Sequence, residues 1–177
     1  MKMSEYRLPK LVENSTEFAA INDFIAENTI KLWKNSKESV IFVPFCEKFI
    51  RALQMEHRKG RIIRGFELIE RNLASESKGL QLVDEKTGTS RGQRVSRLLI
   101  ISNDGAERYY RKVEGLIANN KPRVLPLMID ADSDHLGELF FGEGKTVKLM
   151  LLEHKESVSA ALLAIIKAFK NKTEEND

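Results

Sequence analysis

Apolar residues recur along the second half of the chain at two spacings, and each spacing predicts a different element. Short continuous apolar runs are typical of strands covered on both faces, and they predict strands at residues 98–101, 123–129 and 146–152. Apolar residues three and four positions apart predict amphipathic helices between and after these strands. Asn103 or Asp104 is expected to cap the first of these helices, Ser133 the second, and the third covers residues 157–169.

The first half of the chain shows the same alternation with less regular spacing. Helices are expected at residues 16–33, 46–57 and 66–73, and short extended segments at 40–43 and 61–64. The following stretch, residues 74–94, is rich in Ser, Gly, Lys, Glu and Thr. This composition predicts a mobile insertion, with a hairpin around residues 80–83.

Helices and strands in this order predict the α/β class: a three-layer α-β-α sandwich with a mixed four-stranded sheet. Pro126 lies within a predicted strand and favours an edge strand or a bulge, because proline has no N–H to donate. The expected organisation is a helical extension (1–44), a main domain with the insertion (45–170), and a frayed acidic tail (171–177).

Charge is distributed unevenly along the chain. The net charge is +3, yet residues 51–97 contain eleven Lys/Arg and six Asp/Glu, so this segment carries +5 and the remainder −2. A basic segment in a nearly neutral protein indicates a surface that faces a polyanion. The single cysteine, Cys46, excludes an internal disulfide and fits a reducing compartment. We find no apolar run of membrane-spanning length and no signal-peptide pattern, and therefore expect an intracellular protein, cytoplasmic or nuclear.

Three local motifs occur in a fixed order. Residues 64–71 (Arg-Gly-Phe-Glu-Leu-Ile-Glu-Arg) place a glycine at a strand-to-helix turn and a base two turns into the helix. Residues 98–105 form an apolar strand with a polar, acidic end, and residues 132–137 lead through Leu-Gly to a second glycine turn at 142–144. Together they resemble the L-seven-Ae/L-thirty-e ribosomal-protein superfamily, over about the last two thirds of the chain.

The resemblance implies an L-thirty-e-like fold and recognition of a kink-turn-like or otherwise structured RNA. Gly65 would allow close approach of the RNA backbone, with Glu67 in the same turn and Arg71 as the basic contact. The implied base-facing loop consists of Asp132, Ser133, Asp134 and His135. Phosphate contacts would come from Arg61, Arg64, Arg94 and Arg97, together with Arg91. The chain would then be a non-catalytic subunit of a ribonucleoprotein, with structured RNA and other protein subunits as partners.

The chain departs from the superfamily pattern at the first turn. Glu67 stands where the family usually has Asn, and Leu68 where it usually has Glu. The second loop is acidic, with Asp130, Asp132 and Asp134. The long insertion and the arginine at the basic position resemble divergent members found in nuclear ribonuclease P and MRP particles.

Other readings of the same residues are open. Glu67, Glu70 and Arg71 equally fit a solvated helix face, and the three aspartates fit a helix cap better than a calcium loop. Tyr109 and Tyr110 suit base stacking, although one of them must face the core. The alternative function is a protein-interaction module with little RNA affinity, in which an apolar N-terminal element docks within the chain or on a partner. That element contains Phe18, Ile21, Phe24 and Trp33.

Catalytic and cofactor motifs are missing from the sequence. The three histidines, His57, His135 and His154, are far apart, so we expect no metal site. Gly142 and Gly144 precede a strand and lack the third glycine of a dinucleotide fingerprint. There is no Gly-Lys-Ser/Thr phosphate loop and no Gly-x-Ser-x-Gly nucleophile turn. We therefore expect no enzyme, no cofactor and no small-molecule substrate.

Overall fold

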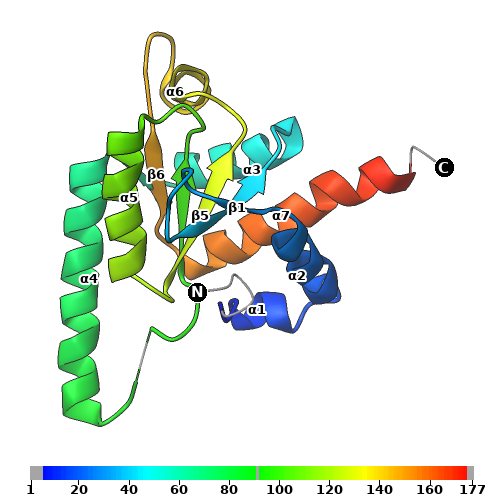
Figure 1. Cartoon of the computed structure of the whole chain (residues 1–177). Helices are drawn as coiled ribbons and strands as arrows, with labels where there is room; N and C mark the ends of the chain where they lie inside the picture. Colours follow the sequence, from blue (N-terminus) through cyan, green and yellow to red (C-terminus); the bar gives the residue numbers. More distant parts are fainter. Residues whose placement is uncertain (1–5, 91, 175–177) are drawn as a thin grey trace.

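The structure is a computed structural model that describes residues 6–90 and 92–174, with side chains described as far as residue 170. Its centre is a six-stranded mixed sheet in the order β1-β2-β5-β4-β6-β3 (Figure 1). The strands are β1 (Thr29–Lys31), β2 (Ser39–Val43), β3 (Ile62–Arg64), β4 (Arg97–Ile101), β5 (Val124–Ile129) and β6 (Leu149–Leu152). β2, β5 and β4 are parallel, whereas β1, β6 and β3 each pair antiparallel with their neighbours.

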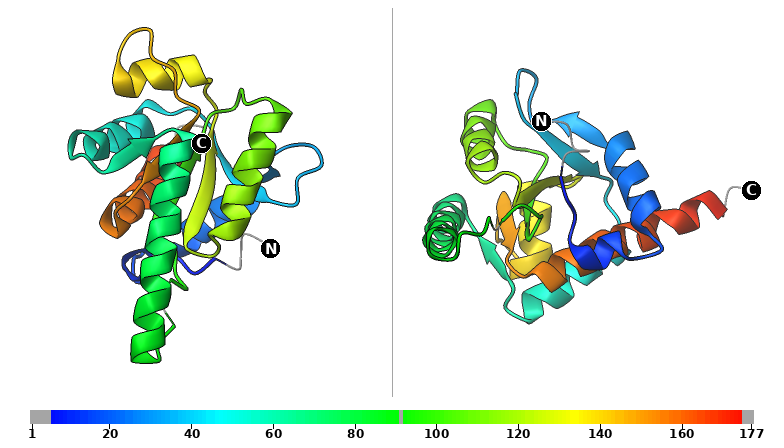
Figure 2. Two further views of the ribbon diagram at one scale, coloured as in Figure 1. Left: turned by 90° about the vertical axis from the view of Figure 1, so that its left-hand side faces the viewer. Right: turned by 90° about the horizontal axis from the view of Figure 1, so that it is seen from below.

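Helices cover both faces of the sheet, as the three-layer prediction requires (Figure 2). One face carries α4 (Phe66–Thr87) and α5 (Glu107–Asn119). The other carries α1 (Lys10–Glu13), α2 (Phe18–Glu27), α3 (Glu47–Arg58) and α7 (Lys155–Glu174), with α6 (Ser133–Phe141) at the upper end in Figure 1. The α/β class is therefore confirmed, while the sheet has six strands and not four.

The two additional strands come from the N-terminal segment. The helix predicted over residues 16–33 ends at Glu27, where Asn28 Nδ2 donates to the Phe24 carbonyl at 2.8 Å and Thr29 Oγ1 to that of Ile25 at 2.6 Å. The Asn28 N–H also bonds to the Phe24 carbonyl, so carbonyls of the last helical turn have partners without a further turn. Residues 29–31 then pair with β2 as β1, so the helix predicted as far as residue 33 is shorter than expected and an unpredicted strand follows it.

The apolar side chains of this segment contact the chain itself. Ile21 is buried in the core, and the Phe24 ring stacks on Phe169 of α7 with centroids 5.4 Å apart. Trp33 Nε1 donates to Glu114 of α5 at 3.3 Å. Of the two ways in which this element was expected to dock, the structure shows the intramolecular one.

Pro126 lies in a central strand, which contradicts the expected edge or bulge. β5 pairs with β4 from Val124 onward, and Pro126 is opposite Leu99 in that ladder. Pairing with β2 begins only at Leu127, one residue later. The proline is tolerated because the ladder on its second side starts just beyond the missing N–H.

α4 continues through most of the predicted insertion, so the expectation of a mobile loop with a hairpin is wrong for residues 74–87. These residues are mainly good helix formers, and the helix ends at Gly88 in a left-handed conformation (φ 65°) whose N–H bonds to Asp84. Glu76 accepts from Arg97 at 3.0 Å and also from Arg123, which attaches the middle of α4 to the sheet. The C-terminal part of α4 extends past the sheet (Figure 2).

Smaller differences concern the ends of elements. α5 begins at Glu107 after Ala106, so neither Asn103 nor Asp104 caps it. β6 covers only the second half of its predicted range. The acidic tail predicted for residues 171–177 lies outside the described side chains.

Candidate nucleic-acid interface

Strand direction brings distant polar segments together at one end of the sheet. β6 is antiparallel to both β4 and β3, so β3 runs in the direction of β4, β5 and β2. The carboxyl ends of these four strands therefore meet at one end, at the top in Figure 1, which we call the upper end. The upper end holds the β3–α4 turn, the loop after β4, the loop after β5 and the segment before β6.

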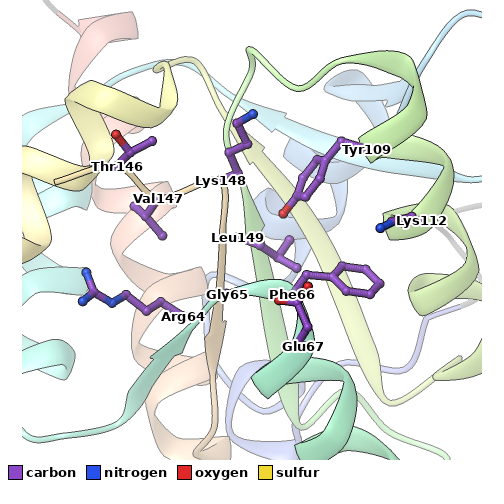
Figure 3. A pocket seen from close by; sticks show the side chains of 10 residues that line it. All are labelled: Arg64, Gly65, Phe66, Glu67, Tyr109, Lys112, Thr146, Val147, Lys148 and Leu149. Atoms are coloured by element: carbon purple, nitrogen blue, oxygen red, sulfur yellow. The ribbon is translucent and has the colours of Figure 1, made fainter.

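A cleft of about 440 Å³ opens at this upper end (Figure 3). Its walls come from the β3–α4 turn, from α5 and from residues 146–149. Three cationic side chains and one carboxylate are among the lining residues, which are Arg64, Gly65, Phe66, Glu67, Tyr109, Lys112, Thr146, Val147, Lys148 and Leu149. The excess of positive charge makes this cleft a candidate site for an anion.

Gly65 forms the turn between β3 and α4. Its backbone has φ +89° and ψ 142°, a combination that side-chain-bearing residues rarely adopt, and no atom lies within 4 Å of an added Cβ. Its N–H donates to the Leu149 carbonyl at 3.0 Å, which fixes the turn against β6. Phe66 and Glu67, the first residues of α4, line the cleft, and no side chain caps the N–H groups of this first turn.

Aromatic rings and cations alternate around the cleft. The rings of Phe66 and Tyr109 meet edge to face, with centroids 6.4 Å apart. Lys112 Nζ lies 6.0 Å from the Phe66 centroid, and Lys148 Nζ lies 5.5 Å from that of Tyr109. On the outer side, the guanidinium of Arg64 lies 4.1 Å from the ring of Phe141. Such contacts hold each cation beside a flat apolar surface.

Tyr109 keeps its hydroxyl proton throughout the neutral range. Burial, and to a smaller extent the nearby carboxylate of Glu67 and the phenol of Tyr110, together raise the pKa of Tyr109 to about 12. Burial of the deprotonated form and repulsion between two negative charges are both unfavourable. The hydroxyl is therefore a hydrogen-bond donor and acceptor, and not a base, at pH 7.

The loop predicted to face an extruded base is held by internal hydrogen bonds. Asp132 caps α6 by accepting from the His135 N–H at 2.8 Å. Ser133 is buried and donates both its N–H and its hydroxyl to Asp104. Asp134 accepts from Thr146 at 2.7 Å. Helix capping thus accounts for Asp132 and a side-chain hydrogen bond for Asp134, while Asp132, Asp134 and His135 remain exposed.

The Leu-Gly pair of α6 has a packing role. A Cβ on Gly137 would lie 1.9 Å from the Lys145 carbonyl oxygen and 2.6 Å from the Thr146 Cα. Only glycine allows the segment before β6 to lie this close to α6. This contact places residues 146–148 at the wall of the cleft.

Four of the predicted arginines lie away from the cleft. Arg61 is partly buried and bonds to Glu56 and Ser157. Arg94 pairs with Glu13, and Arg97 with Glu76, at the opposite, lower end of the sheet where β4 begins. Arg71 is exposed on α4 but does not line the cleft. Arg91 lies outside the described residues. Of the predicted set, the cleft unites Arg64, Gly65 and Glu67.

Two lysines of the cleft were not predicted. Lys112 lies three residues after Tyr109, so both occupy one face of α5. Lys148 directly precedes the buried strand β6 and is exposed. The three-residue spacing of Tyr109 and Lys112 is the sequence signal from which the α5 side of the cleft could have been predicted.

Comparison with known proteins leaves the family open. No protein-family model matches the chain, and no curated protein matches it. Among solved structures, a protein of unknown function from Bacillus halodurans gives a TM-score of 0.44 at 18% identity, over 68% of this chain and 97% of the other. A 15.5-kDa RNA-binding protein from Giardia lamblia gives 0.43 at 11% identity, over 68% and 84%. Likeness at this level assigns neither family nor function.

The described residues contain no cluster of three or more His, Cys, Asp or Glu side chains arranged to hold a metal ion. None of the helices in the described part of the chain is both long and apolar enough to cross a membrane.

Proposed function

We propose that the protein binds structured RNA at the upper cleft, as a non-catalytic subunit of a ribonucleoprotein. The observation that carries the proposal is the convergence of Arg64, Lys112 and Lys148 on one open cleft that also contains two aromatic rings. Cations bind phosphates of any sequence, and unstacked bases pack on aromatic faces. A surface with both groups suits RNA whose bases are partly unpaired, such as a kinked or looped helix.

The turn at Gly65 adds a fixed phosphate-binding element. The uncapped N-terminus of the 22-residue helix α4 presents backbone N–H groups and a positive dipole end beside Arg64. The open space around Gly65 allows a nucleic-acid backbone to approach these groups closely. Glu67 opposes phosphate binding at the same place, because its carboxylate repels the negative charge of the phosphate.

Titration of RNA into the purified protein at several salt concentrations tests the proposal. A kink-turn RNA and an unkinked duplex of equal length serve as ligands. Three neutralised phosphates predict a slope of about −2 to −3 for log K against log salt concentration. Lys112→Glu and Lys148→Glu are expected to weaken binding of the kinked RNA at least tenfold, because each replaces a cation that attracts phosphate by an anion that repels it.

The matched control is Lys167→Glu, which changes an exposed lysine of α7 on the other face of the sheet. Its affinity is expected to stay within twofold of the unmodified protein. Equal affinities for all three variants would rule out the upper cleft as the RNA site. If kinked and straight RNA bind equally well and the cleft variants weaken both, the cleft is the RNA site but does not prefer kinked RNA.

A further inference from the structure

A second, larger groove lies at the lower end of the sheet, where β4 begins. Its volume is about 830 Å³, against about 440 Å³ for the upper cleft. The groove is bounded by the second half of α4, the start of β4, the segment around Arg7 and Lys10, and Lys155 at the start of α7. It exists because α4 continues past the sheet, as Figures 1 and 2 show.

The inner surface of this lower groove is aliphatic. Leu80 and Val83 of α4 line one side, and the segment around Val95, whose own side chain is buried in the core, lies opposite. All buried residues of α4, Ile69 and Leu73, lie in its first half, so the described residues beyond them have no buried side chain. Val83 is 36% exposed on a helix whose other side faces solvent. An aliphatic surface of this kind on a projecting helix is typical of a site for another chain.

The rim of the lower groove is strongly basic. Six cationic side chains line it, with Glu76 as the carboxylate among the lining residues. Glu76 is already bound by Arg97 and Arg123, and Arg94 is paired with Glu13. Arg7, Lys10 and Lys155 have no ion pair with any carboxylate of the described residues. Three cations beside an aliphatic surface are therefore available to bind the carboxylates of a partner.

We propose that the lower groove binds a segment of a partner protein that combines acidic and aliphatic residues. Aliphatic side chains of the partner would cover Leu80 and Val83, and its carboxylates would meet Arg7, Lys10 and Lys155. RNA fits this surface less well, because the described lining contains no aromatic ring on which a base stacks. The proposal does not depend on RNA binding at the upper cleft.

Selection of random peptides displayed on phage, with the full-length protein as bait, tests this proposal. Enriched peptides are expected to contain both Asp/Glu and Leu/Ile/Val. The affinity of one such synthetic peptide is then measured for the protein and its variants. Val83→Asp and Lys155→Glu are each expected to weaken it at least tenfold. A glutamate at position 155 suits the first turn of α7, so this change does not endanger the fold.

Leu82→Asp is the matched control for Val83→Asp. Leu82 is the next residue on the same helix, is 49% exposed, and does not line the groove. Its variant is expected to bind the peptide within twofold of the unmodified protein, as is Lys112→Glu at the upper cleft. The proposal would be overturned if no acidic-aliphatic peptide were enriched, or if Leu82→Asp and Val83→Asp weakened peptide binding equally. Binding of oligouridine, a single-stranded RNA, is measured for the same variants. If Lys155→Glu abolishes oligouridine binding and leaves peptide binding unchanged, the groove is a nucleic-acid site instead.

Discussion

Asp104 accepts two hydrogen bonds from Ser133, one from the backbone N–H at 3.0 Å and one from the hydroxyl at 2.6 Å. The pair ties the loop after β4 to the first turn of α6, 29 positions later in the chain. Burial acts to raise the pKa of Asp104, but the hydrogen bonds that the carboxylate accepts, with that from the Ser133 hydroxyl the largest, outweigh it, and the pKa lies below its usual value. The upper end is thus held together by a carboxylate that stays ionised at neutral pH.

Ser133→Ala tests the strength of this tie. Removal of the hydroxyl leaves one hydrogen bond to Asp104, and we expect the free energy of unfolding to fall by about 1 kcal/mol. The pKa of Asp104 is expected to rise toward its usual value. Chemical denaturation gives the first quantity and a carboxyl NMR titration the second. An unchanged pKa would show that Ser133 does not hold the carboxylate.

Two glycines within helices are expected to respond to alanine in opposite directions. At Gly137 an added methyl group would collide with the Lys145 backbone, and we expect a loss of about 1–3 kcal/mol. At Gly115 of α5 nothing lies within 4 Å of an added Cβ, so Gly115→Ala is expected to stabilise the protein by about 0.5–1 kcal/mol. Thermal and denaturant unfolding of both variants measure the contrast. A similar effect of both substitutions would contradict the close contact at Gly137.

The buried Glu56 of α3 predicts a loss of stability in acid. Burial acts to raise its pKa, but hydrogen bonds from Ser157 and Lys59 and the charges of Lys59 and Arg61 lower it below the usual value. A carboxyl whose pKa is lower in the folded than in the unfolded state stabilises the fold at pH values above about 4.3, its pKa in the unfolded chain. This stabilisation is lost as the pH falls through the pKa of the carboxyl in the folded state. Glu56→Gln should therefore be less stable at pH 7.

The variant should also lose less stability than the unmodified protein when the pH is lowered below about 4.3. Glu47→Gln is the control on the same helix, since the side chain of Glu47 is 76% exposed. Denaturation curves over a pH series give both profiles. Parallel profiles for Glu56→Gln and the unmodified protein would show that Glu56 is not the titrating group.

Glu67 is expected to affect both Tyr109 and the RNA. Its charge contributes to the pKa of about 12 of Tyr109, so Glu67→Gln should lower that pKa, although burial, the larger cause, remains. The chain has three tyrosines, and comparison with Tyr109→Phe assigns the ultraviolet signal. The same variant should bind RNA more tightly, because a negative charge leaves the cleft. Weaker binding would mean that the carboxylate accepts a hydrogen bond from a base.

The sequence was informative where the apolar pattern is strong and misleading where it is weak. The helix around Phe49 and the strand at 98–101 were predicted closely, because buried faces impose regular spacing. The second half of α4 was missed because it buries nothing, and so its apolar pattern is faint although its residues favour helix. β1 was missed because three residues become a strand only by pairing with β2.

The candidate site was predicted in part for a similar reason. Gly65 and Arg64 belong to one local turn, which a motif can describe. Lys112 and Lys148 meet only in the folded chain, through α5 and β6. The basic segment of residues 51–97 was treated as one surface, yet it spans β3 and the start of β4. Arg64 and Arg97 therefore lie at opposite ends of the sheet.

Both strands at the margins of the six-stranded sheet, β1 and β3, are three residues long. A marginal strand leaves one row of backbone N–H and C=O groups unpaired, and a long row recruits strands from other molecules. Because this row is short on either side and the exposed Lys31 lies at the end of β1, strands of other molecules have little backbone with which to pair. The protein is thereby protected against aggregation through its strands at high concentration.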